Sequence, residues 1–191
     1  MCILTNIIIM DGKFFCTKDQ VRETVYKYGV AVVPNVLCEQ EIEDMRNGMF
    51  SYLEYITQNF DIPIDRNNRK TYKEYFKLLP NKGMLMQFWK IGHAQFIWNL
   101  RQNPKIVDIF AKIWYCNRED LLVSFDGAAF HFPPEITNRG KLNNFWYHTD
   151  QSFTRPDFEC IQSWVTGYDV REGDGTLAFI EGSNRFHKKI A

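Results

Sequence analysis

Metal-ligand chemistry is concentrated in one short stretch of the sequence, Trp146-Tyr-His148-Thr-Asp150-Gln151. Of the four histidines, only His148 has a carboxylate within ligand reach, that of Asp150. Side chains two residues apart in a strand point to the same face, so this pair can present an imidazole and a carboxylate to one ion. With a second histidine from another strand, such a pair forms the facial triad of non-haem Fe(II) oxygenases. The spacing alone is a weak signal, and a hydrogen-bonded His–Asp pair in a loop is the structural alternative.

A surface that mixes polar and aromatic side chains is predicted on the next strand, Cys160–Val170. Even-numbered side chains of this strand share one face; they are Cys160, Gln162, Trp164, Thr166 and Tyr168. The mixture of polar and aromatic side chains suits the wall of a pocket better than a dry core. An ordinary amphipathic strand has the same period, so this interpretation stays open beside the first.

The elements that must position these residues change character near residue 120. Before it, apolar residues recur at three- and four-residue steps, as in Ile42, Met45, Met49, Leu53 and Ile56, which predicts amphipathic helices. We expect helices over about residues 17–28, 39–59, 71–79, 93–101 and 104–115, a hairpin over about 7–15 and a strand at 30–33. Gly29 is placed to end the first helix.

After residue 120 the pattern is that of strands. They are expected at Leu121–Pro133, Phe145–His148, Cys160–Val170 and Thr176–Ile180. Helices followed by strands predict a single α+β domain over residues 1–191, with a helical support over about 17–118 and a β core over about 120–191. We expect the core to be an antiparallel jelly roll, or double-stranded β-helix.

Composition excludes several classes of protein. Hydrophobic residues make up 45% of the 191 residues and aromatics 16%, too many for a disordered chain. The 23 basic and 23 acidic side chains give no basic excess for nucleic acid. No run approaches the roughly 18 apolar residues of a membrane span, and no signal peptide is recognisable. Five cysteines without CxxC spacing predict reduced thiols in a cytoplasmic protein.

Several segments together resemble the phytanoyl-CoA dioxygenase-like family of Fe(II)- and 2-oxoglutarate-dependent oxygenases. They are Tyr147-His-Thr-Asp-Gln151, Trp164, and Gly173-Asp-Gly-Thr-Leu-Ala-Phe-Ile-Glu-Gly-Ser183. The stretch from Tyr28 to Ile42 is similar to the family's opening strand, Pro-x-Val-Leu turn and helix. The resemblance covers about residues 17–191, and the spacing between the segments is more specific than any one of them.

The resemblance implies a cofactor set and a reaction. Fe(II) would be held by His148, Asp150 and a third ligand, with 2-oxoglutarate as cosubstrate, Trp164 flanking it, and ascorbate as a candidate reductant. O₂ and 2-oxoglutarate would be consumed to hydroxylate a small organic substrate, with release of succinate and CO₂. Asp150 leaves no ligand vacancy for a halide, which favours hydroxylation over halogenation. No catalytic residue beyond the metal ligands is implied, and neither a particular substrate nor an oligomeric state is predicted.

The chain departs from the family pattern near its end. Glu181 and Asn184 stand where the family usually has Pro and His. His187 is a poor match for the third metal ligand, which is a second histidine in the family, and we expect it to be an exposed loop histidine. We therefore expect a β core incomplete at the C-terminus, without a third ligand or a matched Arg for 2-oxoglutarate. The alternatives are a catalytically incomplete, truncated or degenerate, jelly-roll module for binding or structure and, last, a zinc hydrolase, for which no general base is positioned.

Overall fold

The computed structural model of the chain describes residues 2–7, 12–137, 148–171, 174 and 176–190. Contacts divide the chain into two units, each built from separate segments. The first unit comprises Met1–Cys38, Pro104–Leu121 and Phe145–Ala191, and the second comprises Glu39–Asn103 and Leu122–Asn144. Each unit therefore draws on residues from both sides of position 120. The single domain with consecutive helical and β halves stays a prediction.

A three-stranded sheet lies in the first unit. Its strands are β1 (Cys2–Ile7), β2 (Val30–Val32) and β5 (Trp164–Val170), in the order β2-β1-β5. Both pairs are parallel, with Ile3 opposite Ala31 and Leu4 opposite Trp164. The connection from β1 to β2 contains helix α1, the kind of crossover that a parallel pair requires. The partner of β5 is thus the N-terminal strand, whereas the sequence analysis expected antiparallel pairing in the C-terminal half.

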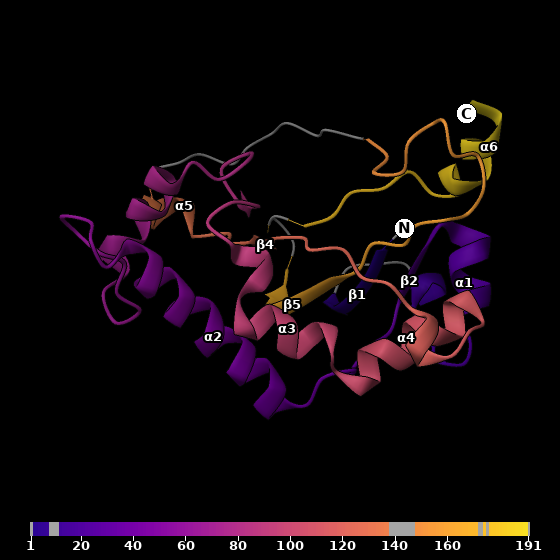
Figure 1. The fold of residues 1–191 in the computed structure, drawn as a ribbon, viewed down its shortest axis with the longest axis horizontal. Helices are drawn as coiled ribbons and strands as arrows, with labels where there is room; N and C mark the ends of the chain where they lie inside the picture. Colours follow the sequence, from indigo (N-terminus) through magenta and orange to yellow (C-terminus); the bar gives the residue numbers. More distant parts are fainter. Residues whose placement is uncertain (1, 8–11, 138–147, 172–173, 175, 191) are drawn as a thin grey trace. The chain divides into compact units, whose positions relative to one another are not determined.

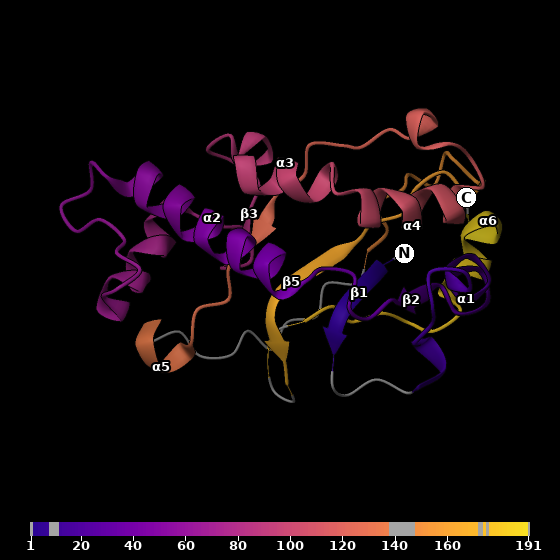
Figure 2. The same cartoon turned by 90° about the horizontal axis from the view of Figure 1, so that it is seen from below.

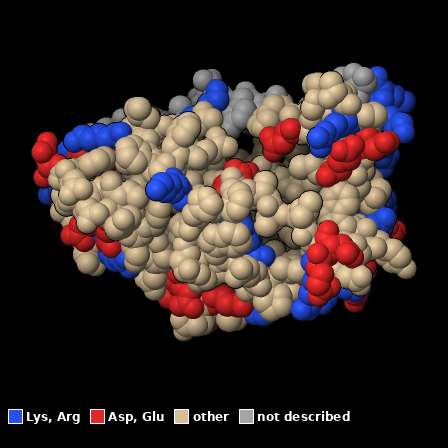
Figure 3. Space-filling model, viewed as in Figure 1, with Lys and Arg blue, Asp and Glu red and all other residues tan. Residues whose placement is uncertain are grey.

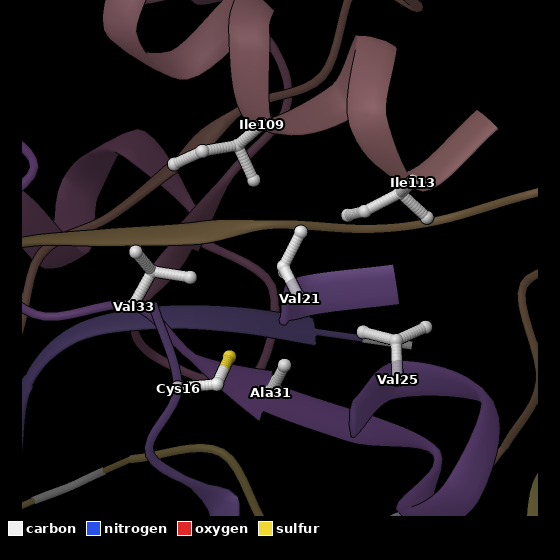
Figure 4. Packing of buried hydrophobic residues seen from close by; sticks show 7 residues of the cluster. All are labelled: Cys16, Val21, Val25, Ala31, Val33, Ile109 and Ile113. Atoms are coloured by element: carbon white, nitrogen blue, oxygen red, sulfur yellow. The ribbon is translucent and has the colours of Figure 1, made fainter. Parts of the chain in front are cut away.

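Helices α1 (Val21–Tyr28) and α4 (Pro104–Trp114) pack together in the same unit and form its core. The four-residue spacing of Val21 and Val25, and of Ile109 and Ile113, puts each pair on one helix face. Figure 4 shows these side chains gathered with those of Cys16, Ala31 and Val33. Burying each Val or Ile contributes about 1.5–3 kcal/mol. The predicted helices at 17–28 and 104–115 and the strand at 30–33 are confirmed.

Gly29 ends α1, and the C-terminal segment covers the helix end (Figure 1). Gly29 has φ 82°, a left-handed conformation that glycine adopts without steric cost. The last carbonyls of a helix lack partners inside it. Here the backbone N–H of Gly182 donates to Tyr28 O at 3.0 Å, Asn184 Nδ2 donates to Tyr26 O at 3.2 Å, and the Arg185 guanidinium donates to Lys27 O. The 3₁₀ helix Ser183–Phe186 and helix α6 (His187–Ile190) are held by these bonds.

The second unit contains the long helix α2 (Glu39–Thr57), which packs on α3 (Gln95–Arg101), as Figures 1 and 2 show. Strands β3 (Leu85–Met86) and β4 (Ala128–Ala129) form a short antiparallel pair, and α5 (Pro134–Thr137) follows. Further 3₁₀ turns lie at Ile91–His93 and, in the first unit, at Gly12–Phe14 and Arg118–Asp120. The predicted helices at 39–59 and 93–101 are confirmed. None of the helices in the described ranges is long and apolar enough to cross a membrane.

The segment Arg69–Leu78 is a 3₁₀ helix where the sequence predicted an α-helix at 71–79. A 3₁₀ helix has three residues per turn, so side chains three apart align on one face. Tyr72, Tyr75 and Leu78 are all buried at this spacing. A spacing of three suits this helix and also an α-helix, so the backbone hydrogen bonds three residues apart at its two ends, Thr71 N–H to Asn68 O and Leu79 N–H to Phe76 O, are what mark the tighter helix.

The predicted strands after residue 120 are only partly present. Strands are found at 128–129 and 164–170, while 121–127, 130–133, 160–163 and 176–180 are irregular. Alternating side chains are not sufficient for a strand, because each strand needs a neighbour for its backbone N–H and C=O groups. Residues 145–147 of one predicted strand, and 8–11 of the predicted hairpin, lie outside the described residues. The second strand of that hairpin is wrong, because Gly12–Phe14 is a 3₁₀ helix. The jelly roll is not seen in the described ranges and stays a prediction.

Candidate metal site

His148 and Asp150 lie side by side in an irregular segment of the first unit. Nε2 of His148 is 3.0 Å from Oδ1 of Asp150, and the two side chains are 56% and 46% exposed. Residues 148–150 are not in a strand, so a local bend at Asp150 brings the side chains together, and strand periodicity does not. The structure thus pairs the two predicted ligands where solvent can reach them. Their role in binding a metal stays a prediction.

His187 is occupied by other contacts. Its Nε2 lies 2.9 Å from the carbonyl oxygen of Arg155. The same nitrogen lies 3.2 Å from Nε2 of Gln151, so it is engaged in hydrogen bonding and is not open to a metal. The ring stacks on Phe153, with centroids 5.7 Å apart, and the residue is half-buried at the start of α6. His187 therefore does not supply a ligand through Nε2, but it is less exposed than the sequence analysis expected.

A complete metal-binding group is not assembled in the part of the chain that the structure describes. No cluster of three or more His, Cys, Asp or Glu side chains there could hold a metal ion. The pair of His148 and Asp150 accordingly supplies two donors. A facial triad needs a third from elsewhere.

Trp164 begins β5 and packs into a core cluster. It is half-buried against Phe14, Val30 and Val32, which are themselves buried. The predicted common face of β5 is not uniform in its exposure to solvent. Thr166 is buried, whereas Tyr168 on the same face is 58% exposed. The structure therefore places Trp164 on the sheet, and its role beside a cosubstrate stays a prediction.

The residue that the sequence analysis missed is Gln151, which directly follows the pair. Its side-chain amide bonds to three backbone groups of residues 155–159. No motif signals such a role, because glutamine is ordinary in a polar loop and its partners are backbone atoms of any sequence. Only the folded loop reveals it.

A groove of about 770 Å³ opens elsewhere in the first unit. Its walls come from residues 15–20, 33–38 and 105–109, and none of the three predicted site residues lines it. Cys16 is buried there, and burial raises the pKa of its thiol above the usual range. The thiol is thus held in its protonated, unreactive form.

The charged side chains just before α1, in α4 and in the 3₁₀ turn after α4 form ion pairs with one another. Lys18 and Arg118 both bind the Asp108 carboxylate, and the hydrogen bond from Arg118 lowers the pKa of Asp108. Lys112 binds Asp19 in the same way and lowers its pKa. On the face shown in Figure 3, basic and acidic side chains are interspersed. The pairs of Lys18 and Asp19 link the segment just before α1 to α4 within the first unit.

Comparison with known proteins gives distant relatives. The chain is 22% identical over 162 residues to Ava biosynthesis cluster protein O of Aspergillus versicolor, which is 85% of this chain and 49% of that protein. It is 28% identical over 122 residues to a Dictyostelium discoideum protein named "Putative phytanoyl-CoA dioxygenase", which is 62% of this chain and 33% of that protein. No family model matches the chain, and no solved structure matches it significantly.

The chain spans about half the length of the first relative and a third of the second. One of these relatives carries the name of a dioxygenase, a class of oxidoreductase. Similarity to it extends over more than half of the chain, although at low identity.

Proposed function

We propose that the chain is part of an Fe(II)- and 2-oxoglutarate-dependent dioxygenase of the phytanoyl-CoA dioxygenase-like type. The observation that carries the proposal is the pairing of His148 and Asp150, with their donor atoms 3.0 Å apart and accessible. The name of the Dictyostelium relative supports the same class. A small organic substrate, a cytoplasmic location and a completed double-stranded β-helix belong to this proposal.

The donor atoms fit the proposed metal in type and spacing. Imidazole nitrogen with carboxylate oxygen is the ligand set of non-haem Fe(II) oxygenases. Two donor atoms about 3 Å apart are close enough for one ion to contact both. Nε2 of His148 and Oδ1 of Asp150 already have this separation. A direct hydrogen bond between the two side chains has the same length, so a bound metal must replace the proton that they share. Metal titration and the succinate assay distinguish a hydrogen-bonded pair from a metal-binding pair.

Each residue has a distinct part in the proposed reaction. His148 binds through a neutral Nε2, and Asp150 offsets part of the cation's charge and fixes its position beside the histidine. Trp164 would flank the cosubstrate. Bound Fe(II) would supply the activation of O₂: a substrate C–H, O₂ and 2-oxoglutarate become C–OH, succinate and CO₂. The third ligand would lie outside the described residues.

The experiment is an assay of succinate release. The chain is incubated with Fe(II), ascorbate and 2-oxoglutarate, with and without the variant His148→Ala. His93→Ala is the matched control, because His93 lies in the second unit, with its ring tilted against that of Phe125 and the ring centroids 4.7 Å apart. Succinate formed by the wild type and by His93→Ala, but not by His148→Ala, supports the proposal. Equal succinate from all three proteins would refute it.

A second candidate function is a non-catalytic module that keeps the pair for binding or structure. It is favoured by the lack of a third donor beside His148 and Asp150 in the described ranges. Fe(II) binding that depends on His148, without succinate release, would support this second function. The Zn(II)-dependent hydrolase has no such observation in its favour.

A further inference from the structure

Gln151 uses its whole side-chain amide to close a loop directly after the candidate pair. Its Nε2 donates to the carbonyl oxygens of Arg155 and Asp157, at 2.6 Å each. Its Oε1 accepts from the backbone N–H of Glu159 at 3.2 Å. A carboxamide has two hydrogens to donate, so both are used. Residues 151–159, the Gln151 loop, are therefore closed around a single side chain.

The far end of the Gln151 loop is fastened to two helices. The ring of Phe158 lies 5.0 Å from that of Tyr26 on α1 and 4.7 Å from that of Trp114 on α4, centroid to centroid. Phe158 also packs against the core cluster that contains Ile113. Contacts between tilted aromatic rings and partial burial of Phe158 thus hold this end of the loop on the core of the first unit.

Helix α6 fastens the middle of the loop. Nε2 of His187 lies 2.9 Å from the carbonyl oxygen of Arg155, the same oxygen that accepts from Gln151, and 3.2 Å from Nε2 of Gln151 itself. Lys188 Nζ lies 3.1 Å from Oδ1 of Asp157. The carbonyl group of Arg155 is consequently held by two donors from different parts of the chain.

We infer that Gln151 is a positioning residue that holds the backbone beside Asp150 and so keeps the two metal donors in place. The inference rests on the proposed function, because it concerns the same site. The hydroxyl of Thr149, which lies between the two donors in sequence, donates to the Gln151 carbonyl at 3.1 Å. Ligands held by neighbouring hydrogen bonds lose less freedom when a metal binds, which raises metal affinity. Gln151 acts through the loop and does not itself contact the metal.

The test compares Gln151→Met with Gln58→Met. Methionine keeps the length and neutrality of glutamine and removes its donors and acceptor. Gln58 is exposed and makes no side-chain hydrogen bond within the described residues, so its replacement controls for the change itself. The dissociation constant for Co(II), a spectroscopic substitute for Fe(II), is measured by visible absorption well below the melting temperature of each variant. Hydrogen exchange of the amides of residues 151–159 is measured in parallel.

Gln151→Met is expected to weaken Co(II) binding by about tenfold, because the loss of its hydrogen bonds to residues 155–159 loosens the backbone next to Asp150. Exchange in the Gln151 loop should rise, and Gln58→Met should bind Co(II) like the wild type. A merely structural role would lower the melting temperature and leave the Co(II) affinity of the folded protein unchanged. An unchanged affinity in Gln151→Met would overturn the inference.

If Gln151→Met does not fold, His187→Phe carries the test. Phenylalanine keeps a ring on Phe153 and loses the donation to Arg155 O, so we expect affinity to fall by about fivefold, equivalent to one hydrogen bond. Affinity equal to that of the wild type would overturn the inference. His148→Ala is titrated alongside, because it distinguishes a failure of the role assigned to Gln151 from a failure of the metal site itself. If it binds Co(II) as well as the wild type does, the proposed function itself fails.

Discussion

Replacing Gly29 with alanine is expected to destabilise the chain by about 2–3 kcal/mol. Gly29 has φ 82° at the end of α1, where an L side chain costs about 1–2 kcal/mol. A Cβ there would also lie 2.8 Å from Oδ1 of Asn184, so the asparagine must move. Moving it breaks its 3.2 Å hydrogen bond to Tyr26 O, a further loss of about 1 kcal/mol.

The assay is urea and thermal unfolding of Gly29→Ala beside Gly12→Ala. Gly12 lies outside the left-handed region and a Cβ there would meet nothing within 4 Å, so this control should change stability by less than about 0.5 kcal/mol. For a chain of this length, 2–3 kcal/mol lowers the melting temperature by about 4–12 °C. The double variant with Asn184→Ala should lose less than the sum of the two single losses, because both remove the same hydrogen bond. If Gly29→Ala is as stable as Gly12→Ala, the described end of α1 is wrong.

Three further results are expected. Ile113→Ala should cost about 2–5 kcal/mol in urea unfolding, because Ile113 is fully buried, whereas Leu122→Ala, at a side chain 99% exposed, should cost less than about 0.5 kcal/mol. Burial raises the pKa of Tyr52 from 10.0 to about 12. The stability gained from keeping this hydroxyl protonated is therefore complete below pH 10.0 and is lost as the pH rises toward 12. Unfolding measured across that pH range should show a smaller loss of stability for Tyr52→Phe than for the wild type. Hydrogen bonds from Arg66 lower the pKa of Glu54. Their contribution to the free energy of unfolding is therefore complete above the usual carboxyl pKa and is lost as the pH falls through the lowered pKa. Arg66→Lys should cost about 1 kcal/mol at neutral pH and reduce this dependence on acid, as unfolding at several pH values would show. A Leu122→Ala as costly as Ile113→Ala, or pH profiles identical to those of the wild type, would contradict these expectations.

The helices were predictable because their signals are local. The three- and four-residue spacing of apolar side chains predicted α1, α2 and α4, and Gly29 marked the end of α1 within a residue. The 3₁₀ helix at Arg69–Leu78 was missed as such, because spacings of three fit both helix types and only the backbone hydrogen bonds distinguish them.

Strands were less predictable because pairing is not local. The segment 160–170 was predicted as a strand, but its parallel partner, β1, comes from the other end of the chain. Leu121–Pro133 has strand-like composition, yet only Ala128–Ala129 finds a partner among the described strands. Periodicity reports which residues suit a strand and does not report which neighbour will complete it.

The candidate site was predictable only in part. The types and spacing of His148 and Asp150 identified the pair, which the structure brings together at 3.0 Å by a bend where a strand end was predicted. The loop that supports it was not predictable, since Gln151 binds backbone groups that no sequence pattern marks. Phe158 was likewise missed, because its partners Tyr26 and Trp114 are distant in sequence.

Anaerobic titration with Fe(II) tests most directly whether His148 and Asp150 form a metal site. The wild type, His148→Ala, Asp150→Ala and the control His93→Ala are titrated at neutral pH, after each is shown to be folded by its unfolding transition. The exposed pair contributes little apolar burial, so its variants should stay folded. The account predicts that the wild type and His93→Ala bind Fe(II) alike and that both site variants lose binding. Binding that survives in His148→Ala and Asp150→Ala would contradict it.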